Sequence, residues 1–104
     1  PDLVGVCVNL NPDKTNAIFG AETLVIDGVP HIEEIFADLR FRIHATTFFQ
    51  VNTEQAERVL QVILEELQLT GSETLIDAYC GVGSLTLPLA QKARRVVGLE
   101  VQPE

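Results

Sequence analysis

The residues best suited to chemistry lie close together in the second half of the chain. Asp77–Ser84, which reads D-A-Y-C-G-V-G-S, follows a short apolar run, and Glu100 ends the next apolar run. Glycines after a first strand let the backbone approach a ligand, and the helix that follows presents unpaired N–H groups. A carboxylate that ends a second strand can accept hydrogen bonds from two ribose hydroxyls. The pattern therefore predicts a nucleoside pocket at the carboxyl edge of a parallel sheet.

The spacing of the glycines separates two classes of nucleoside cofactor. The dinucleotide fingerprint G-x-G-x-x-G, started at Gly81 and Gly83, needs a third glycine where the sequence has Thr86. This departure weakens the interpretation as a diphosphate site. The pattern D-x-x-x-G-x-G that begins at Asp77 instead resembles the first motif of class I S-adenosylmethionine-dependent methyltransferases, which bind no pyrophosphate.

A second string makes the resemblance more specific. Thr46–Asn52 reads T-T-F-F-Q-V-N and ends 25 residues before Asp77, by the count 77 minus 52. It resembles the F-F-Q-V-N segment of the RNA uracil-5-methyltransferases, which form 5-methyluridine in ribosomal or transfer RNA. Members of that family also read D-x-Y/F-C-G-x-G and then V-V-G-x-E, as Asp77–Gly83 and Val96–Glu100 do here. The resemblance covers Ala45–Glu100 well and the preceding residues more loosely.

The resemblance implies S-adenosyl-L-methionine as the cofactor and assigns a part of its site to this chain. It implies that Gln50 contacts the cofactor, that Tyr79 packs by its adenosine or methionine portion, and that Glu100 holds the ribose. The full set of implied cofactor-binding residues is Gln50, Asp77, Tyr79, Gly81, Gly83, Ser84 and Glu100.

Each polar or aromatic member of this set also has an ordinary structural explanation. Gln50 would satisfy backbone groups where a strand meets a helix, Tyr79 would be a half-buried loop aromatic, and Glu100 would be a solvated acid. Asp77 would brace the glycine loop through backbone hydrogen bonds. Ser84 would act as the N-cap of the helix that it opens.

Cys80 is easily mistaken for a nucleophile. Methylation at C5 of uracil needs a cysteine thiolate to add to C6 and a base to remove the C5 proton. In the family that the motifs resemble, both groups lie well downstream, so we expect no catalytic residue in this chain and no methylation by the chain alone. Cys7 is expected in the core, and no metal site is expected because the two cysteines are 73 positions apart (80 minus 7) without a C-x-x-C.

The elements that position these residues follow from the apolar pattern. The runs Leu3–Leu10, Thr23–Ile26, His31–Phe36 and Leu39–His44 are typical of antiparallel strands, and Asp27-Gly28 predicts a tight turn between the second and third. In the fourth run, apolar and charged residues alternate, which predicts one buried and one solvated face.

The apolar period changes at Asn52, which is a plausible N-cap with Gln55 placed for a reciprocal bond. The stripe of an amphipathic helix follows, and the helix is expected to end near Leu69–Gly71 with glycine in the left-handed cap. The remaining elements are expected to be a strand, a helix and a strand, over Thr74–Ala78, Ser84–Ala93 and Arg95–Glu100.

These elements predict an α+β fragment. A β-rich antiparallel central subdomain would occupy residues 1–46, and residues 47–104 would supply a helix and the first βαβ unit of a Rossmann-like class I methyltransferase domain. A two-stranded parallel sheet that is buried on both faces is incomplete, so further strands are expected beyond Glu104. The chain has no methionine and starts at Pro1, which indicates an internal piece of a longer protein.

Composition limits the partners. The chain has 7 Lys and Arg against 15 Asp and Glu, which gives a net charge of -8. It is therefore not expected to provide the main RNA-binding surface. RNA would be bound mostly by other parts of a parent protein. No secretion signal or membrane-length apolar run is present in the sequence, which predicts a cytoplasmic protein that does not contact the membrane. Unpaired sheet edges predict self-association of the piece.

The sequence is also compatible with two other functions. The glycine loop and the acid also occur in nicotinamide- or flavin-dependent Rossmann proteins. Alternatively, the β-rich half is a non-catalytic interaction module with a remnant of a βαβ unit attached.

Overall fold

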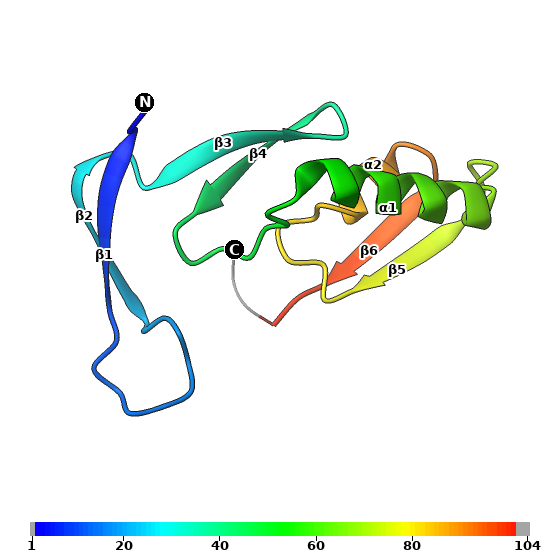
Figure 1. Cartoon of the computed structure of the whole chain (residues 1–104). Helices are drawn as coiled ribbons and strands as arrows, with labels where there is room; N and C mark the ends of the chain where they lie inside the picture. The colour runs from blue at the N-terminus through cyan, green and yellow to red at the C-terminus, as the bar shows by residue number, and fades with distance from the viewer. Residues whose placement is uncertain (1, 102–104) are drawn as a thin grey trace.

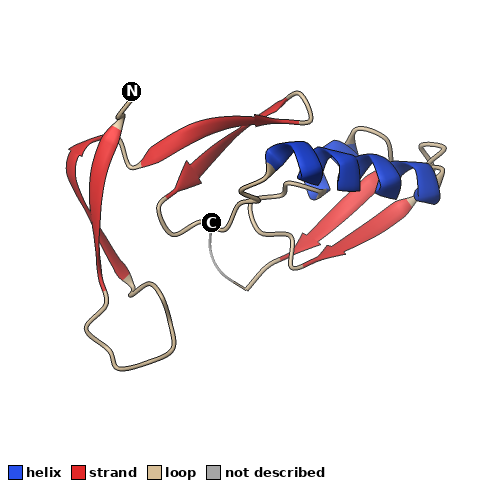
Figure 2. Ribbon diagram, viewed as in Figure 1, coloured by secondary structure: helices blue, strands red, loops and turns tan. Residues whose placement is uncertain are grey.

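The computed structural model describes residues 2–101, so Pro1 and residues 102–104, which the predicted segment boundaries include, lie outside the described residues. Its elements, in chain order, are β1 (Gly5–Leu10), β2 (Glu22–Gly28), β3 (His31–Phe36), β4 (Leu39–His44), α1 (Thr53–Leu67), β5 (Thr74–Ala78), α2 (Thr86–Ala90) and β6 (Arg95–Leu99). The strands pair as three two-stranded sheets, of which β1–β2 and β3–β4 are antiparallel and β5–β6 is parallel. Figures 1 and 2 show the β1–β2 hairpin standing apart from the helices, with the β3–β4 hairpin between them. The α+β class with a parallel strand pair is confirmed.

The predicted tight turn at Asp27-Gly28 is wrong. Strand β2 pairs with β1 and not with β3, and Gly28 lies opposite Gly5 at the end of that pairing. Gly28 has a positive φ of 69°, and a Cβ built on it would lie 2.2 Å from the carbonyl oxygen of Val4. The glycine therefore allows two backbones to approach closely within the hairpin. As a result, β2 and β3 belong to different sheets.

The alternating run on β4 behaves as predicted. Phe41 is buried, whereas Arg40 and Arg42 are exposed on the other face. Phe41 forms the main core with Phe36 of β3 and Leu60 of α1, and these three side chains are 1–4% exposed. The core thus joins the β3–β4 hairpin to the helix that precedes the parallel strands.

Helix α1 begins as predicted but ends earlier. The Asn52 side chain caps it by accepting from the Gln55 N–H at 3.1 Å. The left-handed C-cap is Gln68, with φ 46° and ψ 48°, and not Gly71. Gly71 has a φ of 92° in the next turn, where its N–H donates to the Glu73 carboxylate. The Glu73 carboxylate therefore fixes Gly71 in the turn that follows the helix, and the C-cap lies earlier, at Gln68.

The βαβ unit has the predicted strands and a shorter helix. Leu75 lies opposite Val96 in parallel register, as expected. Helix α2 covers only five residues, and its N-cap is Leu85, without a side-chain cap. Ser84 lies in the turn before the helix, so its predicted capping role is wrong. Pro88 has no N–H to donate to the Ser84 carbonyl, which fits the late start of the helix.

Among the helices of the described residues, none has the length and hydropathy needed to cross a membrane. Residues 2–101 also contain no group of three His, Cys, Asp or Glu side chains placed to hold a metal ion.

Candidate functional site

The candidate site lies at the end of the parallel strand pair. Both strand arrows point to the same end of the sheet, where Tyr79 follows β5 and Glu100 follows β6 (Figure 1). Because this edge collects the residues that follow each strand, it is where open α/β sheets bind ligands.

The loop after β5 is fastened to the end of β6 by backbone groups. The Tyr79 and Cys80 N–H groups both donate to the Leu99 carbonyl, at 2.8 and 3.0 Å. The Gly81 N–H donates to Oε2 of Glu100 at 2.9 Å. The glycine loop and the strand-end carboxylate therefore form one unit.

Glu100 uses both carboxylate oxygens toward the backbone. In addition to the bond from Gly81, its Oε1 accepts the Val101 N–H at 2.8 Å. These bonds fix the orientation of an otherwise exposed side chain. An ionised carboxylate has about four acceptor positions, so it can accept from several donors at once.

Tyr79 combines a strained backbone with an exposed ring. Its φ is 66°, in the left-handed region that residues other than glycine rarely occupy, and its side chain is 86% exposed. The sequence alternative of a half-buried loop aromatic does not describe this side chain. Such strain is concentrated at functional sites, so the exposed ring is a candidate contact for a ligand.

The two glycines of the loop serve different needs. Gly81 has a φ of 52°, and a Cβ on it would have no heavy atom within 4 Å. Gly83 has a φ of 86°, and its Cβ would lie 3.3 Å from Cγ of Leu87. Gly83 is therefore packed against α2, whereas Gly81 borders open space beside the Glu100 carboxylate.

Asp77 is engaged in bracing the unit. It accepts a hydrogen bond of 2.5 Å from the Thr86 hydroxyl, which links β5 to the first residue of α2. The brace uses a side chain and not the backbone groups that the sequence alternative considered. Thr86 was missed as a site residue, although it occupies the position where the dinucleotide fingerprint requires a glycine. Ser84, in the turn between them, is half-buried.

Gln50 is linked to the loop through the core. It is exposed, but the preceding Phe49 packs against the main core with ring centroids 6.1 Å from Phe36 and 5.6 Å from Phe41. Val82 of the glycine loop packs against the same core cluster. The F-F-Q segment and the glycine loop, 32 residues apart by the count 82 minus 50, are thus supported by the same core.

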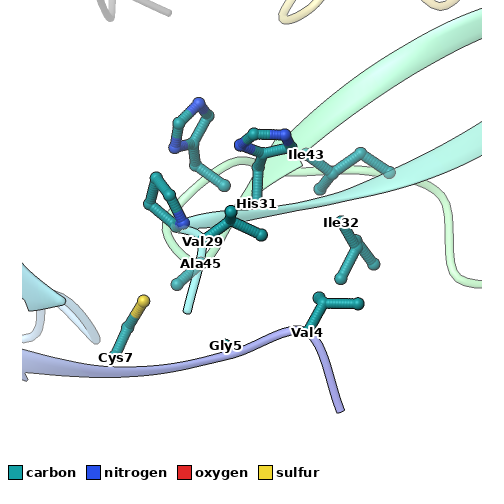
Figure 3. A pocket seen from close by; sticks show the side chains of 10 residues that line it. Val4, Gly5, Cys7, Val29, His31, Ile32, Ile43 and Ala45 are labelled. Carbon is teal, nitrogen blue, oxygen red and sulfur yellow. The ribbon is translucent and has the colours of Figure 1, made fainter. Parts of the chain in front are cut away.

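A separate hollow of about 290 Å³ lies at the junction of the two hairpins (Figure 3). The thiol-bearing Cys7 and the imidazole of His31 border it, with the His31 and His44 ring centroids 5.6 Å apart. Its other walls are aliphatic side chains and backbone. The hollow contains none of the residues that the sequence singled out for cofactor binding, and both cysteines are unbridged.

Comparisons with known proteins identify the class. Residues 23–103 match the family model described as tRNA (Uracil-5-)-methyltransferase. The chain is 62% identical over its whole length to an uncharacterized RNA methyltransferase of Nostoc sp. (strain PCC 7120) and 49% identical to one of Synechocystis sp. (strain PCC 6803). These matches and the βαβ unit define a segment of an RNA methyltransferase.

The structural comparison agrees. The fold is similar to the crystal structure of Pyrococcus abyssi tRNA (uracil-54, C5)-methyltransferase in complex with S-adenosyl-L-homocysteine, with a TM-score of 0.73 and 26% identity. The similarity covers 97% of this chain and 25% of that one. The chain belongs to the tRNA (uracil-5-)-methyltransferase family, as its motifs predicted. It spans 23% of the length of the Nostoc relative and 22% of the Synechocystis relative.

Proposed function

We propose that this chain supplies one wall of the S-adenosylmethionine pocket in an enzyme that methylates C5 of uridine in transfer or ribosomal RNA. Residues 47–104 would be the N-terminal part of the cofactor-binding domain, and residues 1–46 a separate β-rich subdomain. The observation that carries the proposal is the 2.9 Å hydrogen bond from the Gly81 N–H to Glu100, because it joins the two motifs at one sheet edge.

The residues present fit an adenosyl ligand. The Glu100 carboxylate would accept hydrogen bonds from the ribose hydroxyls, and the exposed Tyr79 ring would pack on the adenosine or methionine portion. Gln50 would add a polar contact, and the open side of Gly81 would admit the ligand near the backbone. Asp77, Gly83 and Ser84 would support the loop at its junction with α2.

When bound, S-adenosylmethionine supplies a methyl group that its sulfonium makes electrophilic. The part of this chain would be to bind and orient the cofactor. We propose that the thiolate that adds to C6 and the base that removes the C5 proton come from outside this chain, and that Cys80 does neither. The net charge of -8 supports the same division for RNA, whose phosphates would be held elsewhere in the protein. The expected cytoplasmic location remains a prediction of the sequence.

Family membership favours methyl transfer over a nicotinamide- or flavin-dependent reaction. The Thr86 hydroxyl bonded to Asp77 adds a physical reason, since a side chain occupies the place where a diphosphate-binding loop needs glycine. An interaction module without cofactor binding is the remaining alternative, and a binding experiment separates the two.

The test uses a chimaera in which this segment replaces its counterpart in the Nostoc relative, so that the segment is studied in a protein of full family length. Calorimetry should show binding of S-adenosylhomocysteine that NAD does not displace. Glu100→Ala should weaken binding by about 5- to 150-fold, equivalent to about 1–3 kcal/mol, because it removes the ribose acceptor. Glu100→Gln should lose less, because its amide oxygen can still accept the Gly81 N–H.

Glu66→Ala, on an exposed turn of α1, is the control and should bind as the unmodified chimaera does. Unchanged affinity in Glu100→Ala would remove Glu100 from the site. A folded chimaera that binds no S-adenosylhomocysteine would contradict the proposed function as a whole.

A further inference from the structure

Gly98 is the fourth of the five residues of β6, opposite Asp77 of β5 and two residues before Glu100. Its φ is not in the left-handed region, so the backbone at this position accepts any L-residue. The space beside it does not. A Cβ on Gly98 would lie 2.8 Å from Sγ and 3.2 Å from Cβ of Cys80. The glycine is therefore needed for room and not for conformation.

The space that Gly98 leaves open is filled by the loop that carries the candidate site. Cys80 is half-buried there and directly follows the strained Tyr79. An added methyl group at position 98 would overlap Sγ of Cys80, at 2.8 Å, and would crowd its Cβ, at 3.2 Å, which moves only with the backbone. That backbone is the part of the loop whose N–H bonds to the Leu99 carbonyl at 3.0 Å.

We propose that Gly98 is a positioning residue for the cofactor site. Because it has no side chain, it leaves a space beside β6, here called the seat, in which Cys80 packs and holds the glycine loop against the strand. This inference rests on the proposed function for its ligand, but its structural part does not. With the seat filled, the loop would lift from β6. The Tyr79 ring would then lose its place, and the Gly81 N–H would separate from the Glu100 carboxylate. Cys80 would thus act through packing, which gives a thiol in this motif a purpose other than chemistry.

The test is a double-mutant cycle in the Nostoc chimaera with Gly98→Ala, Cys80→Ala and both together. Gly98→Ala should weaken S-adenosylhomocysteine binding on the order of tenfold, within the range for coupled residues in contact. Cys80→Ala should stay within about twofold of the unmodified protein, since the seat is only partly emptied. The double variant should recover part of the affinity, because removal of the thiol takes away the 2.8 Å contact and leaves only the 3.2 Å contact with the Cys80 Cβ.

Val97→Ala is the control for a purely structural effect. Val97 is the neighbouring residue on β6 and faces the opposite side of the sheet, paired with Ile76. Its truncation should lower the thermal unfolding midpoint without changing the affinity for S-adenosylhomocysteine. Gly98→Ala should change the affinity, and the double variant should restore part of it even where the midpoint stays low.

Hydrogen exchange without ligand gives the second measurement. A peptide that covers residues 79–83 should exchange faster in Gly98→Ala than in the unmodified chimaera and should return toward the original rate in the double variant. Unchanged exchange in Gly98→Ala, or a double variant as poorly protected as the single one, would overturn the proposal. If exchange follows the prediction and no variant binds S-adenosylhomocysteine, the proposed function is wrong, whereas the packing role of Gly98 is supported.

Discussion

Two residues other than glycine with left-handed backbones illustrate how single positions serve different purposes. Gln68 ends α1 with a φ of 46°, and Tyr79 opens the glycine loop with a φ of 66°. Each carries a conformational cost of about 1–2 kcal/mol relative to a relaxed backbone. At Gln68 the conformation ends a helix, a task that glycine performs better. At Tyr79 it presents an aromatic ring at the candidate site.

We therefore predict different functional results for the same kind of substitution. Gln68→Gly and Tyr79→Gly should each stabilise the chain by about 0.5–1 kcal/mol in urea unfolding, since both remove left-handed strain and neither deletes a buried side chain. Only Tyr79→Gly should weaken S-adenosylhomocysteine binding in the chimaera. Equal affinity in the two variants would show that the Tyr79 ring has no part in binding.

For single residues, the sequence predicted which residues belong to the candidate site better than it predicted which side chains contact one another. The positions of Gly81 and Glu100 follow from motif spacing, and so does their meeting at one sheet edge. The bond between Asp77 and Thr86 could not be predicted, because it depends on the rotation of α2 relative to β5. The contact between Cys80 and Gly98 was missed for the same reason, as it is a matter of sub-ångström packing across the unit.

Among the elements, the connection from α1 to β5 depends on one carboxylate. Glu73 accepts the Thr70 hydroxyl at 2.6 Å and the N–H groups of Thr70 and Gly71 at 2.8 and 3.0 Å. The hydroxyl bond from Thr70, followed by backbone N–H groups, lowers the pKa of Glu73 from 4.5 to about 2. The contribution of Glu73 to the turn that precedes β5 is therefore largest while this group is ionised.

This gives a pH-dependent prediction. Since the pKa of Glu73 is lower in the folded than in the unfolded chain, its stabilising contribution is complete above about pH 4.5 and is lost as the pH falls toward about 2. Glu73→Gln should therefore lower the melting temperature near neutral pH, and the gap to the wild type should close across that interval. Glu66→Gln, at an exposed position of α1, controls for the loss of one charge. A gap that is constant down to about pH 2 would contradict the assignment.

Element types were predictable where the pattern was local. Asn52 as the cap of α1 and the β5–β6 strands follow from nearby residues alone. The pairing of β2 was not, because Asp27-Gly28 suits a tight turn equally well and only the long-range partner at Gly5 decides against it. Helix α2 starts later than predicted because Pro88 cannot donate a hydrogen bond to the Ser84 carbonyl, which the apolar pattern does not register.

On the scale of the whole molecule, much apolar surface remains uncovered in the described residues. Ile76 of β5 is 70% exposed and Leu99 of β6 is 53% exposed, and the parallel register puts both on the face turned away from Leu75 and Val96. Each strand of this two-stranded sheet also has one edge without a partner strand in the described residues. Exposed edges and apolar faces recruit other strands, whereas the net charge of -8 opposes association.

The balance between apolar attraction and charge repulsion predicts self-association that depends on the salt concentration. Light scattering should show a mass that rises with concentration of the chain, and more steeply at about 0.15 M than at about 0.01 M salt, because screening shortens the Debye length from about 30 to about 8 Å. Ile76→Lys should reduce the association by placing a charge on the apolar face. Ile18→Lys, at a site that is 85% exposed outside the strands, should not. A monomeric mass under all these conditions would refute the prediction.

The position of Tyr79 has a practical consequence. The chain contains one tyrosine and no tryptophan, so its ultraviolet emission at tyrosine wavelengths comes from this ring alone. The ring is 86% exposed and projects from the loop that meets Glu100. The chain therefore carries an intrinsic fluorophore at the candidate site, and a change in its emission reports on that loop without any dye.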